Sequence, residues 1–199
     1  MNTQQEILDI KKDLRASMNG ILSARMREAG MPYKLVFGVE LPRLQDIAAD
    51  YTPSRQLAQA LWNENIRETR ILACLLMPAR EFTPALASIW GEEIPTAEVA
   101  QILATHLMPK APGACGLAFE WIASDREMLQ LCGFLCVARL LQQGAQVEAR
   151  SLDELDNQAH ALLDTASPSL RRAISAALTW KQEHEERAKK QEEKGCKQK

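Results

Sequence analysis

Apolar residues recur along most of the chain at intervals of three and four positions, the spacing that places side chains on one face of an α-helix. The first such stripe consists of Ile7, Ile10, Leu14, Met18, Ile21 and Leu22. It predicts a first amphipathic helix that ends near Gly30. The strict alternation that is typical of half-buried strands is nearly absent, so the sequence predicts an all-α protein.

Local signals set the ends of the later helices. Pro42 suits the first turn of a short helix, where a missing amide hydrogen is tolerated. Ser54 and Thr96 each precede an apolar segment and are expected to cap its first turn. The later helices are predicted at 66–76, 83–90, 96–106, 115–123, 127–143, 152–164 and 168–187. The helix at 127–143 is apolar nearly all round, which indicates burial by neighbours on several sides.

Three cap-like breaks precede what we interpret as inner helices, at Asn65, at Ser124-Asp125 and at Ser167-Pro168. The last two lie about 43 residues apart, close to the roughly 40-residue period of HEAT repeats. We therefore expect a HEAT-like α-α superhelix, a short solenoid of antiparallel helix pairs with a concave face. Periodicity alone leaves a compact helical bundle open as an alternative.

The charge distribution argues against a uniformly basic surface. The chain holds 24 basic and 26 acidic side chains, and residues 1–180 alone carry 17 basic against 21 acidic groups. Because a DNA-binding body is usually basic, any DNA contact must come from a local patch. We expect residues 1–180 to form one HEAT-like domain and residues 181–199, rich in Lys and Glu, to extend the last helix into a disordered tail.

Several other classes of protein find no support. The polar start lacks a signal peptide and no apolar run could span a membrane, so we expect a cytoplasmic protein with five reduced cysteines. Cys132 and Cys136 lie one helical turn apart, but in an apolar helix without histidine partners, which indicates core residues rather than metal ligands. No phosphate-binding or dinucleotide motif is present, so we expect no metal and no cofactor.

One ordered set of segments resembles a known family. It comprises Gly38 to Ala48, then Leu57-Ala58-Gln59-Ala60-Leu61-Trp62, then Ile66-Arg67-Glu68-Thr69-Arg70-Ile71-Leu72-Ala73. These segments resemble the opening of the DNA alkylation repair family, the AlkD-type HEAT-like glycosylases. The resemblance covers residues 30–76 well and residues 117–141 and 167–180 more weakly. It implies a HEAT-like fold that cups duplex DNA, and an enzymatic activity that excises cationic alkylpurines.

The resemblance also implies an active site that this chain has changed. The family uses a Trp with an Asp four residues later, an Arg on a later inner helix and a second Trp on the last helix. The Asp falls on about Ala100 or Gln101, the Arg on Leu131 and the second Trp on Ala176. None of these side chains can stabilise a sugar cation, hold a phosphate or stack on a cationic base. We therefore expect weak or absent glycosylase activity.

Seven basic residues are candidates for DNA contacts: Arg67, Arg70, Lys110, Arg126, Arg139, Arg171 and Arg172. Five of them lie on predicted inner helices, and contacts of this kind would make binding depend on salt concentration. An internal ion pair beside Glu68 is an equal alternative for Arg67 and Arg70.

Two other functions remain open. One is a scaffold that binds a protein partner through its concave face with Leu and Trp contacts. The other is an active alkylpurine glycosylase that uses a non-standard carboxylate, for which Glu98 is the candidate. Clustered arginines would favour DNA, acidic residues along the groove would favour a protein partner, and an accessible carboxylate beside an indole would favour the enzyme.

Overall fold

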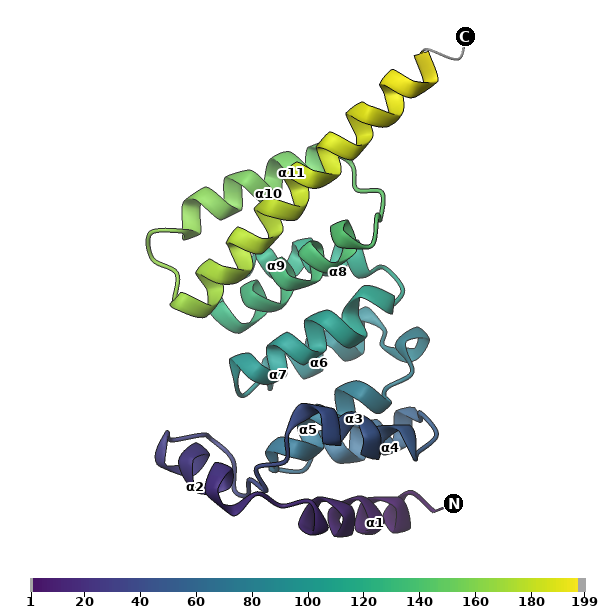
Figure 1. Cartoon of the computed structure of the whole chain (residues 1–199), viewed down its shortest axis with the longest axis vertical. Coiled ribbons are helices and arrows are strands. Elements are labelled where there is room, and N and C mark those ends of the chain that lie inside the picture. The colour runs from purple at the N-terminus through teal and green to yellow at the C-terminus, as the bar shows by residue number, and fades with distance from the viewer. Residues whose placement is uncertain (1, 197–199) are drawn as a thin grey trace. The chain divides into compact units, whose positions relative to one another are not determined.

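The computed structural model describes residues 2–196 and is built from helices throughout that range (Figure 1). Eleven α-helices lie within these residues, and the one β-bridge among them joins Leu35 to Ile66. The chain divides into two compact units, an N-terminal unit of residues 1–112 and a C-terminal unit of residues 113–199. The division falls inside the proline- and glycine-containing stretch at 109–113. The all-α prediction is confirmed over the described residues.

The N-terminal unit contains seven α-helices. They are α1 (Thr3–Ala16), α2 (Gly20–Glu28), α3 (Leu41–Ala49), α4 (Arg55–Trp62), α5 (Arg67–Leu76), α6 (Pro84–Glu92) and α7 (Ala97–Ile102). Helix α5 packs against α3, α4 and α7, so it is the central element of this unit. A π-helical turn at Leu103–Leu107 and a 3-10 turn at Met108–Lys110 continue α7.

The predicted first helix is wrong in one respect, because the structure divides it in two. Helix α1 ends at Ala16, and Asn19 begins α2 by accepting a hydrogen bond from the Leu22 amide. An Asn side chain favours this capping position over a helix interior. The apolar stripe therefore stops at Leu14, while Met18 and Ile21 are 56% and 71% exposed.

Most later helix starts follow the predicted caps. Ser54 and Thr96 each accept a hydrogen bond from the amide three residues on, as expected. Asn65 acts differently, because its side chain accepts from the Lys34 amide rather than capping α5. Ser124 also does not cap α9, whose first turn follows Arg126 and has no side-chain cap.

The C-terminal unit is built around one helix. Its four helices are α8 (Ala114–Ile122), α9 (Glu127–Gln142), α10 (Ala149–Leu162) and α11 (Pro168–Cys196). Helix α9 packs against both α8 and α11, which confirms the predicted burial of this apolar segment. Gly133 allows the approach to α8, since a Cβ there would lie 2.6 Å from the Ala118 carbonyl oxygen.

The charged end of the chain continues the last helix. Helix α11 runs to Cys196 and is drawn as one long rod at the yellow end of the chain (Figure 1). Lys181 forms an ion pair with Asp156 that ties α11 to α10. The prediction for residues 197–199 lies outside the described residues, and the single domain of residues 1–180 stays a prediction.

Candidate nucleic-acid interface and the sealed charge network

Arg67 stands at the centre of a charge network inside the N-terminal unit. Its side chain is 3% exposed, although it was predicted to contact DNA. The guanidinium donates through Nε to Glu98 Oε2 at 2.7 Å and through Nη2 to the other oxygen of the same carboxylate. Nη1 donates to Glu68 at 2.8 Å and to the Val39 carbonyl at 2.9 Å. These bonds leave Arg67 no free edge for a phosphate.

Glu68 is fully buried and holds the segment before α3. Its carboxylate accepts the amide hydrogens of Phe37, Gly38 and Val39 at distances of 3.1, 2.9 and 3.3 Å. Gly38 has a φ of 74°, a left-handed conformation that suits glycine. Successive amides that converge on one anion form a nest, and here the anion belongs to the protein itself.

The same network fixes Glu98, the carboxylate considered for catalysis. The side chain of Glu98 is 34% exposed, yet both oxygens are bound by Arg67. Burial lowers the pKa of Arg67, but the carboxylates of Glu98 and Glu68 outweigh this effect and the pKa is raised. A carboxylate whose two oxygens both accept hydrogen bonds from one guanidinium is held in place and cannot turn toward a sugar cation without breaking that pair. The structure thus gives Glu98 an anchoring role.

Two indoles stack beside this network. The rings of Trp62 on α4 and Trp90 on α6 lie 4.1 Å apart at an interplanar angle of 4°, and both are fully buried. Each indole N–H is used, since Trp62 donates to Glu93 at 3.0 Å and Trp90 donates to Gln59 at 3.1 Å. The stack ties α4 to α6, and the two rings are among the largest fully buried side chains of this unit.

Arg70 covers the remaining face of Trp62. Its guanidinium carbon lies 4.6 Å from the ring centre, and its Nη1 donates to Glu93 at 3.3 Å. An indole, an acid and a guanidinium therefore meet here, which is the combination an alkylpurine glycosylase would need. No base can stack on Trp62, however, because Trp90 covers one face of its ring and Arg70 the other. Sequence reasoning missed Glu93, which lies in a loop without a motif.

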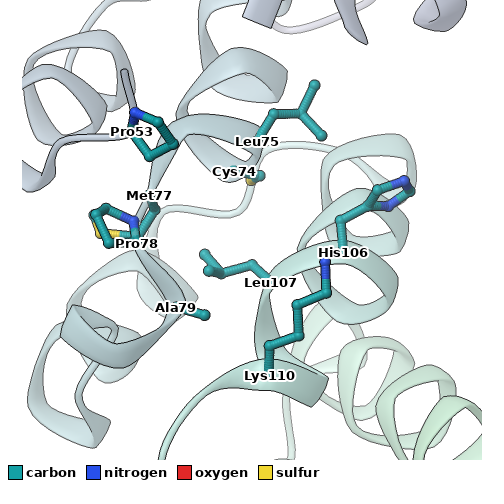
Figure 2. Close-up of a pocket in the computed structure, with 9 residues that line it drawn as sticks. All are labelled: Pro53, Cys74, Leu75, Met77, Pro78, Ala79, His106, Leu107 and Lys110. Carbon is teal, nitrogen blue, oxygen red and sulfur yellow. The ribbon is translucent and has the colours of Figure 1, made fainter. Parts of the chain in front are cut away.

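A pocket of about 270 Å³ lies at the far end of α5 (Figure 2). Its wall is mainly apolar and its lining residues are Pro53, Cys74, Leu75, Met77, Pro78, Ala79, His106, Leu107 and Lys110. Figure 2 shows Lys110 and His106 on the side opposite Pro53 and Pro78. Lys110 is exposed and forms no ion pair with the described residues, so its ammonium is available to an anion such as a phosphate.

The C-terminal unit exposes the arginines predicted on its helices. Arg139 lies on the open side of α9, where it donates to Gln142. Arg172 on α11 is exposed and forms no ion pair with the described residues. Arg126 is exposed just before α9. Arg171 is exposed too, but it donates to the carbonyls of Ala166 and Asp164 and so closes the turn before α11.

At the positions where the family resemblance places catalytic groups, this chain has no carboxylate, no guanidinium and no indole. Ala100 on α7 and Leu131 on α9 are buried, and Gln101 is exposed. Ala176 is half-buried on α11. Trp180, one turn beyond Ala176, is covered by the Arg187 guanidinium at 5.6 Å from its ring centre. Leu131 is a core residue here, as its sequence context indicated.

Two features are absent from the described residues, a cluster of metal ligands and a helix that could span a membrane. No three His, Cys, Asp or Glu side chains in this range converge as metal ligands. No helix in the same range combines the length and apolar character needed to cross a bilayer.

Comparison with known proteins gives a family match and a structural match. The sequence model of the family described as "DNA alkylation repair enzyme" matches residues 10–190. A search of curated proteins gives no significant match. A solved structure is similar with a TM-score of 0.72 and 18% identity over 86% of this chain and 74% of that one. It is described as "a new family of proteins related to the HEAT-like repeat DNA glycosylases with affinity for branched DNA structures". The predicted HEAT-like fold is thereby confirmed.

Proposed function

The chain belongs to the DNA alkylation repair enzyme family, and from this premise we propose that it binds DNA while having little or no alkylpurine glycosylase activity. The main support is the substitution of the expected catalytic groups. The resemblance expects an acid at about Ala100 or Gln101, a guanidinium at Leu131 and an indole at Ala176, and none of these side chains is of the expected kind. A cytoplasmic location fits this proposal.

The geometry of the available carboxylates supports the same proposal. Glycosidic cleavage needs a carboxylate that can face a developing sugar cation, and cationic bases gain from an open indole face. Glu98 is held by Arg67 through both oxygens, and Trp62 is covered on both faces. Glu93 is half exposed, but it is already bound by Trp62 and Arg70.

We assign the DNA contacts to four of the exposed candidates, namely Lys110, Arg126, Arg139 and Arg172, and omit Arg171 because it closes the turn before α11. Arg67 is omitted because it is buried and ion-paired. Arg70 is omitted because it donates to Glu93 and lies over the Trp62 ring. Phosphate contacts position a protein on DNA without reading its sequence, so we expect affinity with little sequence preference. The affinity of the similar solved protein for branched DNA supports DNA as the partner.

A binding titration tests the DNA part of the proposal. Fluorescence anisotropy with a labelled duplex and a four-way junction should show binding that weakens linearly with the logarithm of salt concentration. Arg139→Glu/Arg172→Glu should weaken binding about tenfold at low salt and lower the salt slope by about 2. Arg80→Glu, an exposed arginine outside the proposed contacts, is the matched control.

A release assay tests the enzymatic part. Methylated duplex incubated with saturating protein should release no more N3- or N7-methylpurine than buffer does. Release above that control would contradict the proposal, and Glu93→Gln and Glu98→Gln would then show which carboxylate acts. Absence of both release and salt-sensitive binding would favour a protein-binding scaffold instead.

A further inference from the structure

The turn between α1 and α2, together with the start of α2, exposes large apolar side chains at its tip. Met18 is 56% exposed and Ile21 is 71% exposed, the highest value among the large apolar residues of the described chain. Leu8 on α1 adds a third exposed apolar residue nearby in sequence. Single exposed apolar residues are ordinary on protein surfaces. Two at the tip of one turn require a further reason.

The tip is built rigidly, so its exposure is not a result of loose structure. The Asn19 amide donates to the Phe37 carbonyl at 3.1 Å, and Ser23 Oγ donates to the Val36 carbonyl at 2.7 Å. Gly38 lets these segments approach closely, since a Cβ there would lie 2.5 Å from the Asn19 carbonyl oxygen. Arg43 Nε donates to Ser17 Oγ at 3.1 Å. The fold thus holds Met18 and Ile21 outward.

The surrounding segment is the most basic part of the protein body. Residues 11–43 contain seven Lys or Arg and three Asp or Glu, whereas the rest of residues 1–180 contains ten basic and 18 acidic groups. Arg15 lies three residues before Met18, and Arg25 lies one helical turn after Ile21 on the same exposed face of α2. Arg43 is exposed and is bonded to the turn itself.

We propose that residues 17–21, the turn together with the first two residues of α2, form a wedge that enters a branch point in DNA. Met18 and Ile21 would contact the bases at the junction, and Arg15, Arg25 and Arg43 would hold the flanking phosphates. Minor-groove and architectural proteins insert Met, Ile and Leu side chains between base steps in this way. The strands change partners at a branch point, so base stacking across it is weaker than in a continuous duplex and the wedge meets a smaller unstacking penalty there. This inference rests on the proposed DNA association.

The shape of the site favours DNA over a membrane surface. An interfacial helix needs a broad apolar face, with many apolar side chains along its length. Helix α2 has nine residues, and Ile21 is its only large apolar residue that is strongly exposed. A compact apolar tip between basic side chains matches a gap between phosphates rather than a lipid plane.

The test compares a four-way junction with a linear duplex of equal length for the full chain. Met18→Ser/Ile21→Ser removes the apolar tip and leaves every charge in place. We expect this variant to bind the junction about tenfold more weakly and the linear duplex almost unchanged. Ile89→Ser is the matched control, because Ile89 is 58% exposed on α6 of the same unit. Arg15→Glu/Arg25→Glu should weaken binding to both DNAs and lower the salt slope.

A second readout follows the bases directly. With 2-aminopurine at the branch point, wild-type protein should raise the fluorescence by unstacking the base, while Met18→Ser/Ile21→Ser should not. Unchanged junction affinity and fluorescence in that variant would overturn the wedge, even if DNA binding itself holds. Absence of any DNA binding by the wild type would instead overturn the proposed function. Loss of binding to phosphatidylserine vesicles, with junction binding intact, would assign the tip to a membrane surface and also overturn the wedge.

Discussion

Arginines on the central helices of the two units have opposite environments. In the N-terminal unit, Arg67 is buried and bonded to two carboxylates, and Arg70 lies against an indole. In the C-terminal unit, Arg139 and Arg172 extend from α9 and α11 into solvent. All four were candidates for DNA contacts on equal grounds. The difference shows that a basic residue on an inner helix is a candidate for DNA contact only where it is not already ion-paired with a carboxylate of the fold.

The largest expected effect on stability comes from removing the buried carboxylate of Glu68. Glu68→Ala removes the partner of a buried guanidinium and of three backbone amides, and should lower the free energy of unfolding by about 3–5 kcal/mol. Urea denaturation followed by circular dichroism measures the change. Glu120→Ala, at an exposed position on α8, should change stability by less than about 0.5 kcal/mol. Similar effects from both variants would contradict the sealed network.

The C-terminal unit depends on close helix packing rather than on buried charge. Gly133→Ala places a methyl group 2.6 Å from the Ala118 carbonyl oxygen and 2.9 Å from the Ile122 amide nitrogen. The resulting overpacking should cost about 1–3 kcal/mol of unfolding free energy. Gly116→Ala on α8 has open space and should be neutral or stabilising by up to about 1 kcal/mol. Thermal unfolding of both variants measures the contrast, and equal melting temperatures would argue against the tight α8–α9 contact.

Substitutions at Arg70 and Arg172 test the difference between a paired and an exposed arginine. Arg70→Ala removes the cation over Trp62 and should cost about 1 kcal/mol of unfolding free energy. It should also open one indole face, so acrylamide quenching of tryptophan fluorescence should increase. Arg172→Ala should change neither stability nor quenching, because its side chain is exposed and unpaired among the described residues. An increase in quenching from Arg172→Ala alone would reverse the assignment.

The smallest effect concerns pH in the N-terminal unit. Burial, and then the hydrogen bond to Asp13, raise the pKa of Tyr51 from 10.0 to about 12. A raised pKa in the folded state means that the contribution of the neutral phenol is fully present below pH 10 and is lost as the pH rises toward 12. Between pH 10 and pH 12, the free energy of unfolding of Tyr51→Phe should therefore fall less than that of the wild type. Identical pH profiles for the variant and the wild type would contradict this linkage.

Much of the fold follows from the sequence, because helical periodicity and capping residues are local signals. Ser54 and Thr96 cap the helices that they were expected to cap. The break at Asn19 was missed because Met18 and Ile21 continued the apolar spacing across it. Nothing local marks a residue as exposed once it fits a helical stripe. The partners that hold the tip lie 13 or more positions further along the chain.

The candidate site was less predictable, since burial of a charge depends on distant partners. Glu98 lies 31 positions after Arg67, and Glu93 lies 31 positions after Trp62. Sequence spacing cannot show that these pairs meet. The concentration of basic residues at 11–43 was visible in the sequence as a local count of charges. A count over the whole chain conceals it, because the rest of the body is acidic.

The most direct test of the account measures base release and binding in one sample. Methylated four-way junction is mixed with the wild-type protein at a concentration that anisotropy shows to be saturating, and released methylpurines are quantified over time. The account predicts full binding, loss of that binding at high salt, and release equal to that of buffer alone. Release above the buffer control from the bound junction would contradict it.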